Sequence, residues 1–283
     1  MPASSSGFWE ALEGTRSSRP WWDDTRGRVP YFRTDNESAD SYARLMALHT
    51  AGWCVLWVVC GLTAKLCVCP FLPPSSKGKE NSPFYVGQKL TMEIKVLILC
   101  YLANTVVYDM YSMDPADQFR GYPMAEVSGV IFTTSEIADL LLSGAMGFLD
   151  GTMVAHHCIH IFLGLLIRGH GHPAYTAAIL MAQETSGIFL NYYLLMRNRA
   201  GKHWSVLVSQ GLFALTFFVW RLGLGTYGTV HFLMHAAEHI SPAYARWQVL
   251  TLGAALVIAS CLQWYWGKLI VKGLMRLNRK KDD

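Results

Sequence analysis

Long apolar segments separated by short polar ones make up most of the chain from residue 45 onward. A membrane-spanning helix needs about 20 mostly apolar residues to cross roughly 30 Å of hydrocarbon. Seven segments approach or meet that length, and two of them form a hairpin hinged at Asp150-Gly151. This pattern predicts an all-α membrane protein with about seven transmembrane helices. The expected spans are 45–69, 92–111, 131–149, 153–167, 174–196, 204–224 and 249–270.

The polar segments suggest how the chain is divided. Residues 1–44 form a polar N-terminal tail that has neither the apolar core of a signal peptide nor the acid-poor composition of a presequence. Residues 45–69 are a leading transmembrane helix, 90–272 a six-helix membrane domain, and 273–283 a basic C-terminal tail. We expect 226–245, which follows the sixth span, to form an amphipathic helix at the membrane interface.

Composition agrees with a membrane protein and excludes other classes. Hydrophobic residues make up 52% of the chain and charged residues 16%, against about 25% charged in soluble domains. The net charge of +4 is too small to indicate a nucleic-acid partner, and no basic-aromatic stripe is present. The seven cysteines are odd in number and nearly all lie in apolar segments, so no disulfide framework is expected.

The distribution of Lys and Arg predicts the orientation. Seven spans place residues 70–90, residues 197–203 and the C-terminal segment on one side, with 12 Lys and Arg among them. The short loops on the other side contain three, namely Arg120, Arg168 and Arg246. The positive-inside rule therefore puts the C-terminus in the cytosol or matrix and the N-terminal tail on the opposite side.

Several ionisable residues fall inside the predicted spans. Each costs at least about 2.5–3.5 kcal/mol at mid-membrane, so each indicates a function or a buried partner. Lys95 lies near enough to the start of its span to extend to the interface. The others are Asp109, Glu136, Asp139, His156, His157, His160, Glu184 and Arg221.

The predicted hairpin carries the densest of these groups. Asp150 and His157 lie seven residues apart on one helix face, and helical rise puts Asp139 within about 7 Å of the depth of His157. A carboxylate that orients an imidazole creates a general base, and we assign that role to His157, with His156 beside it. A polar contact that only holds the hairpin together is the alternative.

The fifth and sixth spans add a second polar group. Glu184 lies near the depth of Asp139, and Asn191 is among the polar residues that keep this helix from facing lipid. Arg221 could neutralise an acid or hold an anionic headgroup, although extension to the interface is equally consistent with its position. We therefore assign Glu184, Asn191 and Arg221 to substrate binding.

A second histidine set raises the question of a metal. His231, His235 and His239 are spaced at four residues, which suits a zinc or iron site, and His170 and His172 are expected on the same side of the membrane. The predicted topology separates this set from His156 and His157. We therefore predict no metal ligands, and a metal-dependent hydroxylase is the least favoured function.

The order of these motifs resembles the TLC domain. The chain contains Ser135-Glu-Ile-Ala-Asp139, then Asp150, the pair His156-His157, Glu184-Thr-Ser-Gly-Ile-Phe-Leu-Asn191, and Phe217-Phe-Val-Trp-Arg221. This order is similar to that of translocation-associated membrane proteins, the longevity-assurance ceramide synthases and the ceroid-lipofuscinosis membrane protein. The resemblance covers roughly residues 90–272.

The resemblance implies a six-helix barrel around a lipid-sized cavity and chemistry on long acyl chains. In the ceramide synthase branch, the histidine pair serves acyl transfer from acyl-CoA to an amine, and His156 and His157 occupy those positions here. That branch also carries a His-Asp-x-x-Asp element, where this chain has Gln183-Glu184-Thr-Ser. The chain therefore looks closer to the smaller TLC-domain proteins.

Two functions stay open from the sequence. In the first, the protein handles lipid acyl chains and transfers an acyl group to an amine or hydroxyl, with His156, His157, Asp139 and Asp150 as the catalytic set, acyl-CoA as a co-substrate and no cofactor. In the second, it is a non-catalytic subunit of a larger membrane complex whose partners bind the N-terminal tail. Membrane lipids are partners in both. The endoplasmic reticulum is the expected location, with the mitochondrial inner membrane as the alternative.

Overall fold

The computed structural model describes residues 39–119, 121–168, 173–199, 201, 204–240 and 246–279. The chain separates into two compact units, residues 1–45 and 46–283. The predicted N-terminal tail falls mostly outside the described residues, as do Arg120, His170, His172 and residues 280–283. The described part is helical and contains no strand beyond one isolated bridge between Ser75 and Arg199.

The first two spans are both longer than the apolar pattern suggests. Helix α2 covers Ala39–Thr63 and continues as a π-helical turn, η1, over Ala64–Val68. Helix α3 covers Pro83–Tyr111, with a proline in its first turn, and so begins well before the predicted start at residue 92. Its first turns contain polar residues that resemble a loop in the sequence, but Gln88 is buried against the hairpin, and the helix extends through it.

The predicted hairpin is present. Helix α5 covers Pro123–Ala145, α6 covers Gly151–Arg168, and the turn between them uses Gly147 with a φ of 66°, which favours glycine. The two helices pack along each other. A short helix, α4, over Pro115–Gln118 precedes α5 and is capped by Asp114, which accepts a hydrogen bond from the Ala116 amide.

The fifth and sixth spans each change helix type midway. The fifth consists of α7 over Ala174–Ala182, a 3₁₀ turn η4 over Gln183–Ser186, and α8 over Gly187–Met196. The sixth consists of α9 over Trp204–Thr216, a π-helical segment η5 over Phe217–Leu224, and α10 over Gly225–His239. The prediction of a separate interfacial helix over residues 226–245 is therefore wrong. Gly225 keeps helical dihedrals, and α10 continues the sixth span without a break.

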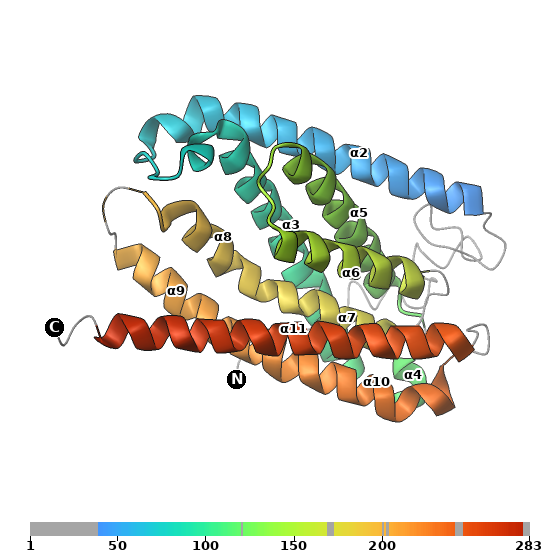
Figure 1. Cartoon of the computed structure of the whole chain (residues 1–283). Coiled ribbons are helices and arrows are strands. Elements are labelled where there is room, and N and C mark those ends of the chain that lie inside the picture. The colour runs from blue at the N-terminus through green and yellow to red at the C-terminus, as the bar shows by residue number, and fades with distance from the viewer. Residues whose placement is uncertain are drawn as a thin grey trace, which may run out of the picture. The chain divides into compact units, whose positions relative to one another are not determined.

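The last helix, α11, covers Arg246–Arg279 and runs beside α10 (Figure 1). It includes most of the predicted basic tail, because no proline follows the apolar segment. Within the described residues, five helical stretches are long and apolar enough to cross a membrane, and Gly151–Ile167 is a shorter apolar one. Together with that shorter helix and the interrupted fifth span, the described residues contain seven helical segments, which correspond to the seven predicted spans.

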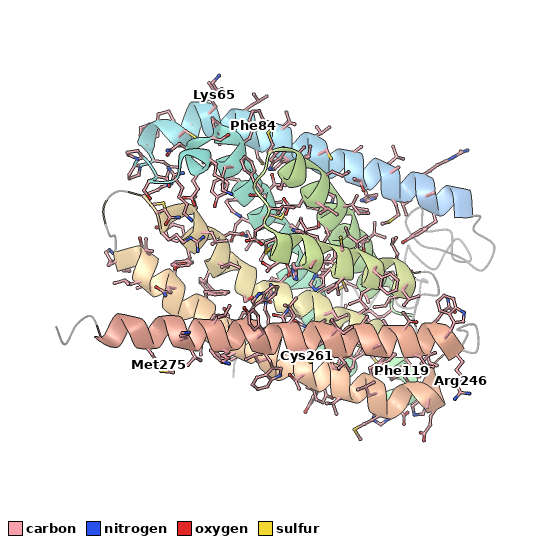
Figure 2. The ribbon with its side chains drawn as sticks, viewed as in Figure 1. Lys65, Phe84, Phe119, Arg246, Cys261 and Met275 are labelled. Atoms are coloured by element: carbon pink, nitrogen blue, oxygen red, sulfur yellow. The ribbon has the colours of Figure 1, made fainter. Side chains whose placement is uncertain are left out.

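Helix α3 occupies the middle of this arrangement and contacts α5, α7 and α8. Val106 and Met110 of α3 pack with Ala125 of α5 and with Tyr175 and Ile179 of α7 in one fully buried cluster. A second cluster joins α10 and α11 to α6 through Phe232, Leu252 and Leu163. Side chains fill the space between the ribbons, whereas Lys65 points away from them (Figure 2).

Two loops predicted on the same side of the membrane are joined directly. The Arg199 guanidinium donates to the backbone carbonyls of Pro73 and Glu80, each at 2.7 Å. The Glu80 carboxylate accepts from Asn198 at 2.8 Å and from Ser75 at 2.7 Å. This contact places both Lys- and Arg-rich loops on one face, in agreement with the charge-based topology.

The packing of α2 against α3 depends on two glycines. A Cβ added at Gly87 would lie 2.5 Å from the backbone of Gly61. We predict that Gly87→Val lowers the free energy of unfolding by about 1–3 kcal/mol, because the backbones must separate. Thermal unfolding in detergent measures this change. Gly52→Val on α2 is the matched control, since no atom lies within 4 Å there, and equal effects of both substitutions would contradict the close approach.

Candidate functional site

Five segments bring ionisable side chains to one buried place between the helices. Helix α3 contributes Lys95, α5 contributes Glu136 and Asp139, and α6 contributes His157. The 3₁₀ turn η4 contributes Glu184, and the π-helical segment η5 contributes Arg221. All six residues are buried. We call these six side chains the ion network.

Lys95 joins two carboxylates. Its Nζ lies 2.7 Å from Glu136 Oε1 and 2.9 Å from Glu184 Oε2. The Lys95 side chain is only 4% exposed, so it does not extend to the interface as the sequence suggested. The nearby acids explain the difference, because two carboxylates inside the protein offset the cost of burying the ammonium group.

His157 lies between the two acids of α5. Its Nδ1 is hydrogen-bonded to Glu136 Oε2, and its Nε2 lies 3.1 Å from Asp139 Oδ2. The contact between Asp139 and His157, expected from helix depths, is therefore present. Asp139 also accepts hydrogen bonds from Ser143 and from Gln88, the latter at 2.9 Å. An imidazole with a carboxylate at each nitrogen donates to both only when both nitrogens carry hydrogen.

Arg221 closes the other end of the ion network. Its guanidinium lies 3.1 Å from Glu184 Oε1 and donates to Ser186 Oγ at 2.7 Å. Arg221 therefore neutralises an acid, which was one of the three roles that the sequence left open for this residue. Three carboxylates face Lys95, Arg221 and His157, so the network is electrically neutral when His157 is an imidazolium.

The two remaining histidines of α6 form a separate pair beside the ion network. The rings of His156 and His160 have centroids 4.0 Å apart, and His156 also packs against Trp266 at 5.3 Å. The Nδ1 atom of His160 is buried and has no hydrogen-bond partner in the described part of the chain. These imidazoles, unlike His157, are not held between two carboxylates.

His160 also lines an apolar groove between α5, α6 and α7. The groove holds about 590 Å³ of empty space, its open mouth included. It extends along α5 from Ala125 to Thr133, which is about 12 Å of helix. Thr133 Oγ1, in the wall of the groove, is a second buried polar atom without a partner among the described residues. The groove is therefore mostly apolar, with Thr133 and His160 toward one end of the α5 stretch and Glu126 at the other.

The sequence-predicted site residues fall into two groups. Asp139, His156, His157, Glu184 and Arg221 lie in or beside the ion network. Asp150 does not, because it is exposed and caps α6, accepting hydrogen bonds from Thr152 and from the Met153 amide at 3.0 Å. Asn191 donates to Glu93 at 3.3 Å and makes no contact with the network.

The predicted site omitted Lys95, Glu136, Gln88 and Ser143. Glu136 was among the intramembrane acids, and its spacing of three residues from Asp139 puts both on one helix face. The depth of Lys95 could have indicated a partner if α3 had been expected to start at Pro83. Nothing in the sequence pattern placed Gln88 inside a membrane helix.

Candidate metal ligands are confined to one group within the described residues. Ligand atoms of Glu136, His156 and His160 lie within 4.8 Å of one another. Both oxygens of Glu136 already contact Lys95 and His157, so these cations occupy the positions that a metal would need. His231, His235 and His239 instead stack along α10, with His231 against Phe119.

Comparison with known families agrees with this architecture. The model of the TLC domain matches residues 50–272. The chain belongs to the TLC-domain family. No curated protein matches the chain closely enough to be called a relative. The ion network, the histidine pair and the groove all lie within the TLC domain, which also includes most of the leading helix α2.

Lys95 tests the ion network directly. We predict that Lys95→Met lowers the free energy of unfolding by about 3–5 kcal/mol, because two buried carboxylates lose their shared cation. Thermal unfolding of the purified protein measures the loss. Lys65→Met removes an exposed lysine and serves as the control. A loss no larger than that of the control would show that the carboxylates do not depend on Lys95.

Asp150 tests the distinction between a helix cap and a catalytic group. Asp150→Ala should destabilise the protein by about 1 kcal/mol, whereas Asp150→Ser, which can still cap, should lose only a fraction of that. Equal losses in unfolding measurements for the two substitutions would contradict the capping role.

The same cap predicts a dependence on pH. Hydrogen bonds from the Thr152 hydroxyl and the Met153 amide hold the pKa of Asp150 below its usual value. Its stabilising effect is therefore complete above the ordinary carboxyl pKa and is lost as the pH falls through the lowered value. In unfolding measurements across that acid range, the wild-type protein should lose this increment and Asp150→Ala should not. Parallel pH profiles of unfolding for the two proteins would contradict the stabilising role of the ionised Asp150 cap.

Proposed function

We propose that this protein binds a lipid acyl chain in the groove between α5, α6 and α7 and transfers the acyl group to an amine or hydroxyl. The observation that carries the proposal is a pair of buried polar atoms, His160 Nδ1 and Thr133 Oγ1, that have no hydrogen-bond partner among the described residues and belong to the wall of a mostly apolar groove. A buried polar atom without a partner is costly, and a bound polar group could satisfy it. Membership of the lipid-related TLC family supports the same substrate class.

The roles of the residues follow from their surroundings. His160 takes the proton of the attacking amine or hydroxyl, which forms a new bond to the acyl carbon of a thioester such as acyl-CoA. The bond from that carbon to sulfur breaks, and the proton passes to the leaving thiolate. His156 contacts His160 and assists in moving the proton. His157, held between Glu136 and Asp139, is a positioning residue that orders the wall of the site.

The remaining assignments extend this proposal to the rest of the chain. Glu184 and Arg221 place the polar end of the substrate through their mutual contact, and Asn191 lies farther along the same span. We place the protein in the endoplasmic reticulum membrane. The Lys and Arg distribution favours an orientation with the C-terminus in the cytosol. No cofactor is needed for the transfer.

Substitution of Gly129 tests the groove. Gly129 lines it, and a Cβ added there would meet no atom within 4 Å, so Gly129→Leu should narrow the groove without strain. We predict at least a tenfold weaker binding of radiolabelled palmitoyl-CoA to the purified protein in nanodiscs. Gly144→Leu is the matched control, because it lies on the same helix in open space and outside the groove.

The chemical step needs a separate variant. His160→Ala should retain palmitoyl-CoA binding and abolish the change in cellular acyl-lipid profile that expression of the wild-type protein produces. Unchanged lipid profiles with both wild-type and His160→Ala protein, together with co-purification of further membrane subunits, would favour the non-catalytic alternative. Equal binding by Gly129→Leu and Gly144→Leu would remove the acyl-chain site altogether.

A further inference from the structure

A second groove lies between α11 and the π-helical segment η5, and no histidine is among its lining residues. Phe218 and Leu222 line it from η5, and Trp264, Gly267 and Val271 from α11. It holds about 1210 Å³ of empty space, with its open side included. Lys268, Lys272 and Met275 complete the wall toward the C-terminal end of α11, where Figure 2 labels Met275.

The charged part of this wall is a single helix face. Trp264, Lys268 and Lys272 follow one another at intervals of four residues, so their side chains lie one turn apart on α11. Both lysines are exposed. The lining residues include these two cations and no acid. The groove therefore combines two positive charges with an otherwise apolar lining.

The shape of the groove follows from a close helix contact. A Cβ added at Gly267 would lie 2.8 Å from Leu222 Cδ1, so the absence of a side chain lets α11 approach η5 there. The Trp264 indole donates to Thr226 Oγ1 on α10 at 3.2 Å, which fixes the ring beside the groove. The hollow is thus framed by ordered contacts on α10, η5 and α11.

The two lysines lie where a phospholipid headgroup would be. The apolar segment of α11 ends near residue 270, and the helix, at 34 residues or about 51 Å, is longer than the roughly 30 Å hydrocarbon core. Lys268 and Lys272 therefore reach the level of the lipid phosphates, while Trp264, which contacts Thr226, lies deeper. Extension of lysines to the interface alone would not need a hollow beneath them.

We propose that this groove is a binding site for a phospholipid with an anionic headgroup. The phosphate contacts Lys268 and Lys272, and one acyl chain passes Phe218 and Val271 and runs toward Leu222 and Trp264. The charge of the site selects the headgroup, because a cationic wall attracts a net negative lipid more strongly than a zwitterionic one. This site is independent of the acyl-transfer groove, so either can fail without the other.

Native mass spectrometry of the full chain, released from nanodiscs with equal phosphatidylglycerol and phosphatidylcholine of identical chains, tests the proposal. We expect phosphatidylglycerol to be retained preferentially. Lys268→Gln/Lys272→Gln should reduce that preference by about 25-fold, at about fivefold for each lysine. The control Lys65→Gln/Lys77→Gln removes two exposed lysines from outside the groove and should leave the preference unchanged.

A third variant separates the groove from the charges. Val271→Trp keeps both lysines and fills the apolar part of the groove, so it should lower retention of both lipids. Equal retention of phosphatidylglycerol and phosphatidylcholine by the wild-type protein would overturn the proposal. So would equal effects of the two lysine pairs, or full lipid retention by Val271→Trp.

Discussion

The cost of placing charge inside a membrane protein is the constraint on which this structure depends. Lys95, Glu136 and Glu184 come from three different segments, yet each is buried and each lies within 3 Å of an oppositely charged partner. An isolated charge at this depth would be strongly unfavourable, whereas a paired one keeps the helices in a single arrangement. The ion network therefore fixes how α3, α5 and the fifth span face one another.

The groove and the histidine pair depend on the same contacts. His157 is held by the two acids of α5, so α6 keeps one rotation relative to α5. That rotation places His160, three residues along the helix, in the wall of the groove. Packing is tight at this point, because a Cβ on Gly164 would lie 2.1 Å from Thr133 Oγ1. The buried charges thus position a reactive surface that they do not themselves form.

The sequence predicted most of the helices and about half of the site. The lengths of the apolar segments and the Asp150-Gly151 turn predicted the spans. The positions of Asp139 and His157 along their helices predicted the contact between them. The misplacement of Lys95 and the omission of Gln88 from the predicted helices have the same physical cause. Lys95 and Gln88 look like interface residues, because their polarity is visible in the sequence but their buried partners are not. Asp150 illustrates the reverse, since a carboxylate before a helix suits a cap as well as catalysis.

Electron cryomicroscopy of the protein in lipid nanodiscs tests the central claim most directly. The account predicts Lys95 Nζ within hydrogen-bonding distance of Glu136 and Glu184, His157 between Glu136 and Asp139, and elongated density between α5, α6 and α7 that ends at His160. Acidic side chains turned away from Lys95 toward a water-filled channel, or a groove closed by side chains with no room for a hydrocarbon tail, would contradict it.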